Sequence, residues 1–165
     1  MAIPLAGALW SWSVDGLASA EKIHSALSGA LGRPVVPLGS ADPNELPSGA
    51  VLCDVWHLGG DFPTSIECYA PPAEAVETVV AAAVARRLGR SLLLPDDTLD
   101  PSRFLLAAPD GTLRPVHVDV ADTDEGQVLS RLRPCTGRSR PSDGPDRCRQ
   151  SRWAPGSVVP ARAAA

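Results

Sequence analysis

The sequence is short of aromatic residues, of lysine and of long apolar runs. Aromatic residues make up 4% of its 165 residues, and Lys22 is the only lysine among fifteen basic residues. No stretch approaches the roughly 20 consecutive apolar residues of a membrane-spanning helix. The first residues also lack the basic start and the long apolar run of a secretory signal, so we expect a cytoplasmic protein. The abundance of arginine, alanine, glycine and proline is typical of a GC-rich bacterial genome.

The sequence motifs that identify many common classes of enzyme are missing as well. There is no glycine-rich phosphate loop, no G-x-S-x-G turn and no H-E-x-x-H pair. The chain has four cysteines, which are Cys53, Cys68, Cys135 and Cys148. They lack the paired spacing of a structural zinc site, and no cationic neighbour is visible that would activate a thiol with His24 or His57 as its base. We expect four reduced thiols, no bound metal and no cofactor.

The residues that are present suffice for one folded domain. Hydrophobic residues make up 44% of the chain, which suits a globular protein with a buried core. Trp10 and Trp12 alternate with serines, which is the period of a half-buried strand. Residues 17–31 then follow a helical period, and Asp15 or Ser19 can cap the start of this helix. The domain is therefore expected to open with a strand and a helix.

A loop and a hairpin are predicted after the first helix. Residues 34–49 hold four prolines and no sustained period, which indicates a long loop. Residues 50–58 and 62–69 read as two strands, and Gly59 and Gly60 between them suit a two-residue hairpin turn.

The register of this hairpin decides which side chains share a face. If Leu58 faces Asp61 across the turn, the core face carries Val51, Cys53, Val55, His57, Phe62, Thr64, Ile66 and Cys68. On the other face lie Asp54, Trp56, Glu67 and Tyr69, an aromatic and acidic patch. Such a composition is typical of a protein-binding surface if helices cover only one side of the sheet. The alternative is that the two aromatic residues pack under the long loop or in a dimer.

A second helix and a second hairpin complete the pattern. Pro71 and Pro72 end the preceding strand, and a helix with charges that complement its dipole runs to Gly89. Residues 92–94 form a strand, and residues 104–120 form a hairpin with a Pro-Asp-Gly turn. Strand, helix, hairpin, helix, strand is the order of a ferredoxin-like β-α-β-β-α-β sheet. We expect this α+β fold, with two helices and an additional C-terminal hairpin.

The end of the chain differs from the rest. Residues 1–130 carry seven basic and seventeen acidic side chains, whereas residues 131–165 carry eight basic and two acidic ones. We expect a single domain over residues 1–132 and a disordered Pro/Arg-rich tail over residues 133–165, because the tail cannot bury enough apolar surface to fold alone. One explanation is a basic arm that binds nucleic acid or an acidic partner. The other, which the abrupt change of composition favours, is an out-of-frame reading of a GC-rich gene.

A histidine and several carboxylates are the candidates for catalysis. His117 and Asp119 lie on one face of the last predicted strand, and Asp96, Asp97 and Asp100 lie in the loop before the second hairpin. Carboxylates near a histidine can do acid–base work or hold a divalent cation. The competing interpretation is that these residues form turns and a solvated strand face, since the loop departs from the calcium-loop pattern.

The run "LLLPDDTLDPSRFLLAAPDGTLRPVHVD" resembles a class of small bacterial α+β proteins, some of which are associated with toxin-immunity loci. In that class a helix is followed by a strand, an acidic loop with Asp-Pro, and a strand pair that turns through Pro-Asp-Gly. The resemblance covers about a third of the chain. It concerns structure and implies no particular functional residue.

Three functional hypotheses follow. The first is a non-catalytic immunity-like or accessory protein, whose aromatic and acidic patch binds another protein or a second copy of the chain. The second is a small acid–base or cation-dependent enzyme that uses His117 and Asp119. The third is nucleic-acid binding through the arginine-rich tail, which requires that the tail be genuine. No membrane association is expected.

Overall fold

The computed structural model describes residues 9–97, 99–135 and 159–160, and its fold is α+β, as predicted. The elements in chain order are β1 (Leu9–Val14), α1 (Ala20–Leu31), β2 (Val35–Pro37), the 3-10 turn η1 (Leu38–Ser40), β3 (Val51–His57), β4 (Thr64–Tyr69), α2 (Glu77–Leu88), β5 (Leu92–Pro95), β6 (Arg103–Ala107), β7 (Thr112–Thr123), β8 (Gly126–Pro134) and β9 (Val159–Pro160). None of the described helices is long and apolar enough to cross a membrane.

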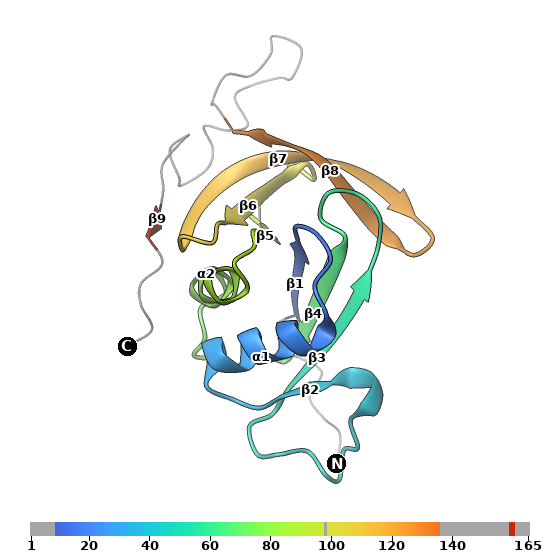
Figure 1. Cartoon of the computed structure of the whole chain (residues 1–165), viewed down its shortest axis with the longest axis vertical. Helices are drawn as coiled ribbons and strands as arrows, with labels where there is room; N and C mark the ends of the chain where they lie inside the picture. Colours follow the sequence, from blue (N-terminus) through green and yellow to red (C-terminus); the bar gives the residue numbers. More distant parts are fainter. Residues whose placement is uncertain (1–8, 98, 136–158, 161–165) are drawn as a thin grey trace.

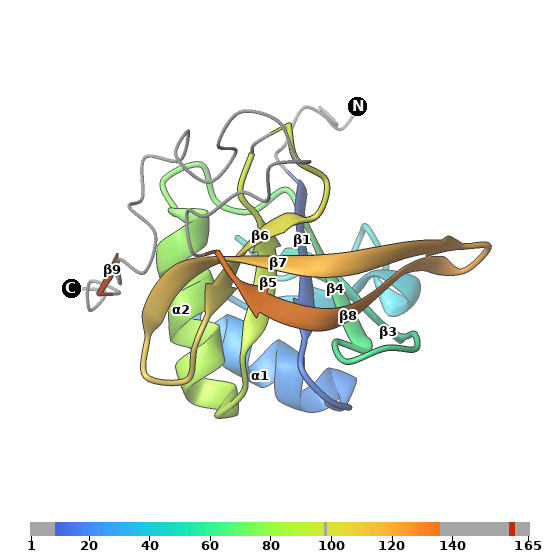
Figure 2. The ribbon, with the colours of Figure 1, turned by 90° about the horizontal axis from the view of Figure 1, so that it is seen from above.

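The strands form one mixed sheet in the order β2-β3-β4-β1-β5-β6-β7-β8, and β9 pairs with the start of β7. All neighbours are antiparallel except β2 and β3. Both helices lie on the same face, where α1 packs on α2, β2 and β3, and α2 packs on β5, β6 and β7 (Figure 1). The long β7–β8 hairpin arches past the end of the sheet (Figure 2). The sheet is therefore wider than the predicted one with a single extra hairpin.

Helix α1 begins three residues later than predicted, because Ser19 and not Asp15 caps it. The Ser19 hydroxyl accepts a hydrogen bond from the Lys22 backbone N–H, which satisfies one of the free donors of the first turn. The helix ends at Gly32, which has the left-handed conformation (φ 64°) and donates its N–H to the Ser28 carbonyl.

Two predicted boundaries are wrong. The predicted long loop over residues 34–49 contains β2 and η1, because Val35 and Val36 can pair in parallel with the start of β3. Helix α2 begins at Glu77 and not directly after the proline pair. A turn intervenes, in which the Ala75 N–H donates to the Pro72 carbonyl.

The turn of the β3–β4 hairpin is longer than predicted. The Leu58 N–H donates to the Pro63 carbonyl at 2.7 Å, so Leu58 lies opposite Pro63 and not opposite Asp61. The shift is two residues, and because side chains alternate with a period of two, each strand residue keeps its predicted face. Phe62, by contrast, lies in the turn and packs in a different cluster.

The β8 strand crosses this turn and fixes it. The Asp61 N–H donates to the Leu129 carbonyl at 2.9 Å, and the Arg131 N–H donates to the Asp61 carboxylate at 2.9 Å. A Cβ at Gly60 would collide with the Leu129 carbonyl, and its φ is 84°. The close approach of β8 therefore requires glycine at position 60.

The core has two parts, one on each face of the sheet. The larger lies under the helices and includes Trp10, Trp12, Val14, Ile23, Leu27, Val51, Cys53, Ile66, Cys68, Val84, Leu92 and Leu94. The smaller lies on the opposite face, at the β5–β8 end, and consists of Phe62, Leu93, Leu106, Val116, Val118 and Leu129. The β7–β8 hairpin thus supplies apolar cover for the half of the sheet that it contacts.

The cysteines only partly follow the prediction. Cys53 and Cys68 are free and buried, whereas Cys135 is disulfide-bonded, so the prediction of four reduced thiols is wrong at this position. Cys148 and most of the predicted disordered tail lie outside the described residues. Strand β8 runs two residues beyond the predicted end of the domain at residue 132.

Candidate functional site

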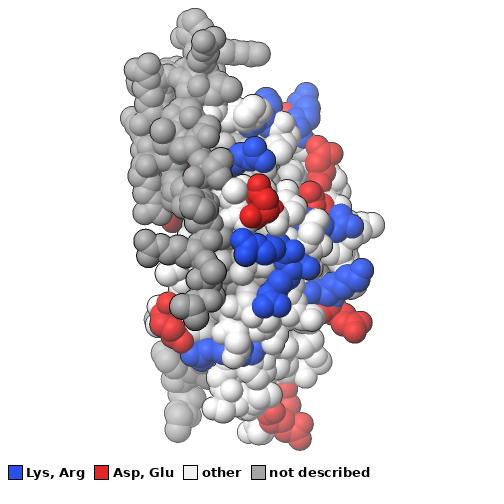
Figure 3. Space-filling view, turned by 60° about the vertical axis from the view of Figure 1, so that its left-hand side comes forward, with Lys and Arg blue, Asp and Glu red and all other residues white. Residues whose placement is uncertain are grey.

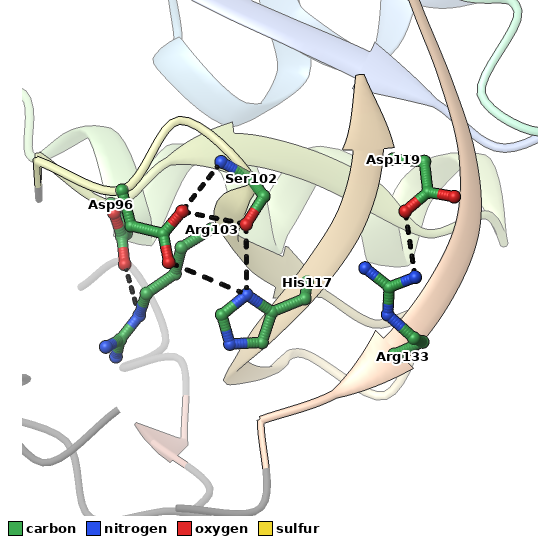
Figure 4. A network of polar contacts seen from close by, with 7 residues as sticks. Asp96, Ser102, Arg103, His117, Asp119 and Arg133 are labelled. Carbon is green, nitrogen blue, oxygen red and sulfur yellow. Dashed lines mark hydrogen bonds and ion pairs between the residues drawn. The ribbon is translucent and has the colours of Figure 1, made fainter. Parts of the chain in front are cut away.

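The predicted catalytic histidine belongs to a small polar network where the start of β6 meets the middle of β7 (Figure 4). Asp100 begins a turn in which its Oδ1 accepts hydrogen bonds from the Ser102 N–H at 3.0 Å and the Ser102 hydroxyl at 2.7 Å. The Ser102 Oγ lies 3.3 Å from His117 Nδ1, and Asp100 Oδ2 lies 3.9 Å from the same nitrogen. The network therefore ties the loop before β6 to β7.

The direction of these hydrogen bonds decides what the network can do. Because the Ser102 hydroxyl donates its single proton to Asp100, the contact with His117 requires the tautomer in which Nδ1–H donates to Ser102 Oγ. Nucleophilic catalysis needs the opposite polarity, with the histidine as base. Burial lowers the pKa of His117, Asp100 raises it, and Arg103 and Arg133 lower it further. A neutral, half-buried histidine that holds a loop is the role this geometry supports.

A buried ion pair lies beside the network. Arg103 Nε is 2.6 Å from Asp96 Oδ2, and only 1% and 5% of the two side chains are exposed. Pairing and hydrogen bonding are what allow such charges to be buried. Arg103 and His117 are cross-strand partners, so the ion pair and the histidine together anchor both ends of the connection between β5 and β6, at Asp96 and at Asp100.

The two remaining predicted residues lie apart from this network. Asp119 binds Arg133 at 2.8 Å and Arg131 at 2.5 Å, and its hydrogen bond from Arg133 is the main cause of its lowered pKa. Asp97 is exposed, with a left-handed backbone (φ 58°). The structure thus brings Asp96 and Asp100 to His117, but neither Asp97 nor Asp119.

Sequence reasoning missed Ser102 and Arg103. The Asp-Pro-Ser sequence at residues 100–102 was a signal for the turn, because an aspartate often caps the N–H two residues on. Arg103 alternates with Leu105 and Ala107, both buried. That period of two placed the arginine inward, toward the acidic loop.

The predicted binding patch lies on the sheet face that the helices leave uncovered. We call Asp54, Trp56, Glu67 and Tyr69 the outer surface. Asp54 pairs directly with Glu67 across β3 and β4, Trp56 pairs with Ser65, and Tyr69 pairs with Leu52. All four outer-surface side chains are partly exposed. Strand β1 extends this face, because Leu9 pairs with Tyr69 and Ser11 with Glu67.

A short hydrogen bond organises one end of the outer surface. The Tyr69 hydroxyl donates to Glu67 Oε2 at 2.6 Å. This bond is the main reason why the pKa of Tyr69 rises to about 12, with smaller contributions from burial and from the negative charge of Asp54. Loss of the phenolic proton would place a third negative charge beside two carboxylates, so the phenol stays protonated and acts as a donor.

The other residues considered for catalysis, Cys53, Cys68 and His57, lie where their side chains serve the fold. Cys53 and Cys68 are buried, and burial is the main cause that raises the pKa of each thiol to about 12, which makes them poor nucleophiles. The His57 ring nitrogen Nε2 lies 2.8 Å from the Ala18 carbonyl and holds the β1–α1 connection. Within residues 9–97 and 99–135, no group of His, Cys, Asp or Glu is arranged to hold a metal ion.

Figure 3 shows basic side chains gathered on one face of the described part of the chain, with acidic side chains among them. An open cavity of about 650 Å³ lies between α1 and α2, where Lys22 and Arg87 are among the lining residues. Arg87 donates to the Gly29 carbonyl at 3.1 Å and so joins the two helices. None of the predicted site residues lines this cavity.

Comparison with protein-family models, with curated proteins and with solved structures finds no match for this chain. Its function therefore has to be argued from its own residues.

Proposed function

We propose that the protein is a non-catalytic binding protein, of the immunity or accessory type, whose outer surface binds another protein. The observation that carries the proposal is the direct pairing of Asp54 with Glu67 across β3 and β4. Like charges directly opposite each other destabilise an antiparallel sheet. The hydrogen bond from Tyr69 accounts for Glu67 within the fold, whereas the positive charge of a partner would account for the second carboxylate, Asp54, that faces it.

The chemistry of the outer surface favours a basic partner. Tryptophan and tyrosine are the residues that most often dominate the energy of protein–protein interfaces, and Trp56 and Tyr69 flank the acidic pair on the same face. Carboxylates between them complement arginine and lysine and accelerate association at low salt. A basic segment of another cytoplasmic protein fits this surface best.

We also propose that the central part of the fold is ferredoxin-like. The inner strands run in the order β3-β4-β1-β5, with antiparallel neighbours and both helices on one face. We regard this unit as ferredoxin-like, extended by β2 at one edge and by β6, β7 and β8 at the other. The extension leaves the outer surface without a covering helix among the described elements.

Affinity capture from a lysate of the source organism tests the proposed function. The wild-type protein is expected to retain a basic protein that elutes as salt is raised, because screening weakens exposed charge pairs. Trp56→Ala/Tyr69→Ala and the charge reversal Asp54→Lys/Glu67→Lys are expected to lose it. Val76→Ala, which removes an exposed apolar side chain at the start of α2, is the matched control. Equal capture by all the variants would contradict the proposal.

A further inference from the structure

Cys53 and Cys68 face each other directly across β3 and β4. The Leu58 N–H to Pro63 O bond makes the 58/63 pair a hydrogen-bonded one. Because the two kinds of pair alternate along an antiparallel ladder, the 53/68 pair is of the non-hydrogen-bonded kind. In such pairs the Cα atoms lie roughly 4.5 Å apart, which is within the range of about 4.4–6.8 Å found for disulfides.

The two thiols share one buried site on the helix side of the sheet. Both residues are 0% exposed and belong to the main core. Trp10 is the cross-strand neighbour of Cys68 on β1, and its indole stacks on Trp12 with ring centroids 5.6 Å apart. Any bond between the two sulfur atoms would therefore form beside a tryptophan pair that reports on it.

We propose that Cys53 and Cys68 are an oxidisable pair that closes into a cross-strand disulfide when a peroxide or a small-molecule disulfide is the oxidant. With hydrogen peroxide, one thiolate attacks an oxygen, the O–O bond breaks, and a sulfenic acid and water result. The second thiol then displaces the sulfenic oxygen as water while the S–S bond forms. Two thiols lose two electrons and two protons, and one peroxide becomes two waters.

Burial controls the rate of this reaction. A thiol must ionise to attack, and buried thiols whose pKa is raised to about 12 ionise rarely. The pair therefore reacts when the hairpin opens or while the chain folds. The resulting bond lies directly under the Asp54–Glu67 pair, so it locks the two strands that carry the outer surface.

Refolding of the full-length chain in a buffer of oxidised and reduced glutathione tests the proposal without this kinetic barrier. Trypsin leaves both cysteines in one peptide, residues 23–86, because proline follows Arg33 and the next cleavable residue is Arg86. After alkylation of free thiols, this peptide is expected to lack both alkyl groups and to be about 2 Da lighter than the reduced form. Further cleavage at aspartate, which cuts after Asp42, Asp54 and Asp61, should leave residues 43–54 and 62–86 joined until the disulfide is reduced.

Two controls keep the result interpretable. The variants Cys53→Ser and Cys68→Ser should each leave the remaining thiol free to be alkylated. Oxidation of the wild type should quench its tryptophan fluorescence. It should also raise the urea concentration at the unfolding midpoint, since the cross-link restricts the unfolded chain. If refolding yield is low, the folded protein is treated with dilute peroxide in urea below the unfolding transition. Recovery of residues 23–86 with both thiols alkylated under both conditions, or a bond from either cysteine to Cys135 or Cys148, would overturn the proposal.

Discussion

The two faces of the sheet formed by β3, β4 and β1 differ in the residues that they carry. On the helix side, Trp10, Trp12 and Ile66 are at most 5% exposed and belong to the main apolar core. On the outer side, Asp54 and Glu67 stand opposite each other, in an arrangement that strand pairing disfavours. The comparison separates residues that the fold needs from residues that it merely tolerates, and the latter are where function is expected.

The largest difference between the faces should come from their tryptophans. Trp12 is 1% exposed and donates its indole N–H to Glu77 at 2.9 Å. Trp12→Ala is expected to lower the free energy of unfolding by about 3–5 kcal/mol, as for other buried tryptophans. Trp56→Ala, on the outer face, should lower it by roughly 1–2 kcal/mol, in line with partial burial. Urea denaturation measures both, and equal losses would break the comparison.

Thr64 and Ser65, which are adjacent on β4 and face opposite sides of the sheet, test the same difference between the two faces. The buried Thr64 hydroxyl accepts from the Ala18 N–H at 3.0 Å and donates to the Gly16 carbonyl at 2.9 Å. Thr64→Val removes the hydroxyl that bonds the Ala18 N–H and the Gly16 carbonyl, and it should lower the free energy of unfolding by about 1–3 kcal/mol. Ser65→Ala, one residue on and facing outward, should change it by no more than about 0.5 kcal/mol. A larger effect at Ser65 would mean that the outer face contributes to folding.

His117 offers a test through pH. Its pKa lies below the ordinary value of 6.5, so the unfolded chain binds a proton more readily than the folded one. Stability should therefore fall as the pH drops through 6.5 toward the lowered folded pKa, and His117→Gln should remove this part of the dependence. Unfolding midpoints between pH 5 and pH 8 provide the measurement. A wild type that instead gains stability on acidification would show that Asp100 holds His117 charged.

The smallest expected effect is a spectroscopic one on the outer face. Tyr69 is the only tyrosine in the chain, so ultraviolet absorbance reports its ionisation without interference from other phenols. The titration midpoint is expected near the value of about 12 to which the bond to Glu67 raises the pKa. Glu67→Ala should return it toward the ordinary value of about 10. An unchanged midpoint would show that the hydrogen bond is absent in solution.

How much the sequence could predict depended on the range of the interactions. The alternation around Trp12 and along β4 predicted the faces correctly, because a register error of two residues does not change which side a strand residue faces. Strand β2 was missed because its three residues gain their order from pairing with β3. Strand β8 was missed because its place depends on the crossing at Gly60, which no local pattern records.

The candidate sites show the same limit. Asp54, Trp56, Glu67 and Tyr69 could be grouped from the hairpin pattern alone, since they follow from alternation and register. The surroundings of His117 could not, because the identity of its neighbours depends on how the loop before β6 folds back. Ser102 and Arg103 therefore emerged only from the three-dimensional contacts.

The free energy of unfolding of Asp54→Asn at low salt tests the central claim most directly. If the outer surface is kept for binding, removal of one of the two facing charges should leave stability unchanged or raise it by about 0.2–1 kcal/mol, the range for cross-strand charge pairs. A loss of about 1 kcal/mol or more would show that Asp54 serves the fold and would contradict the account.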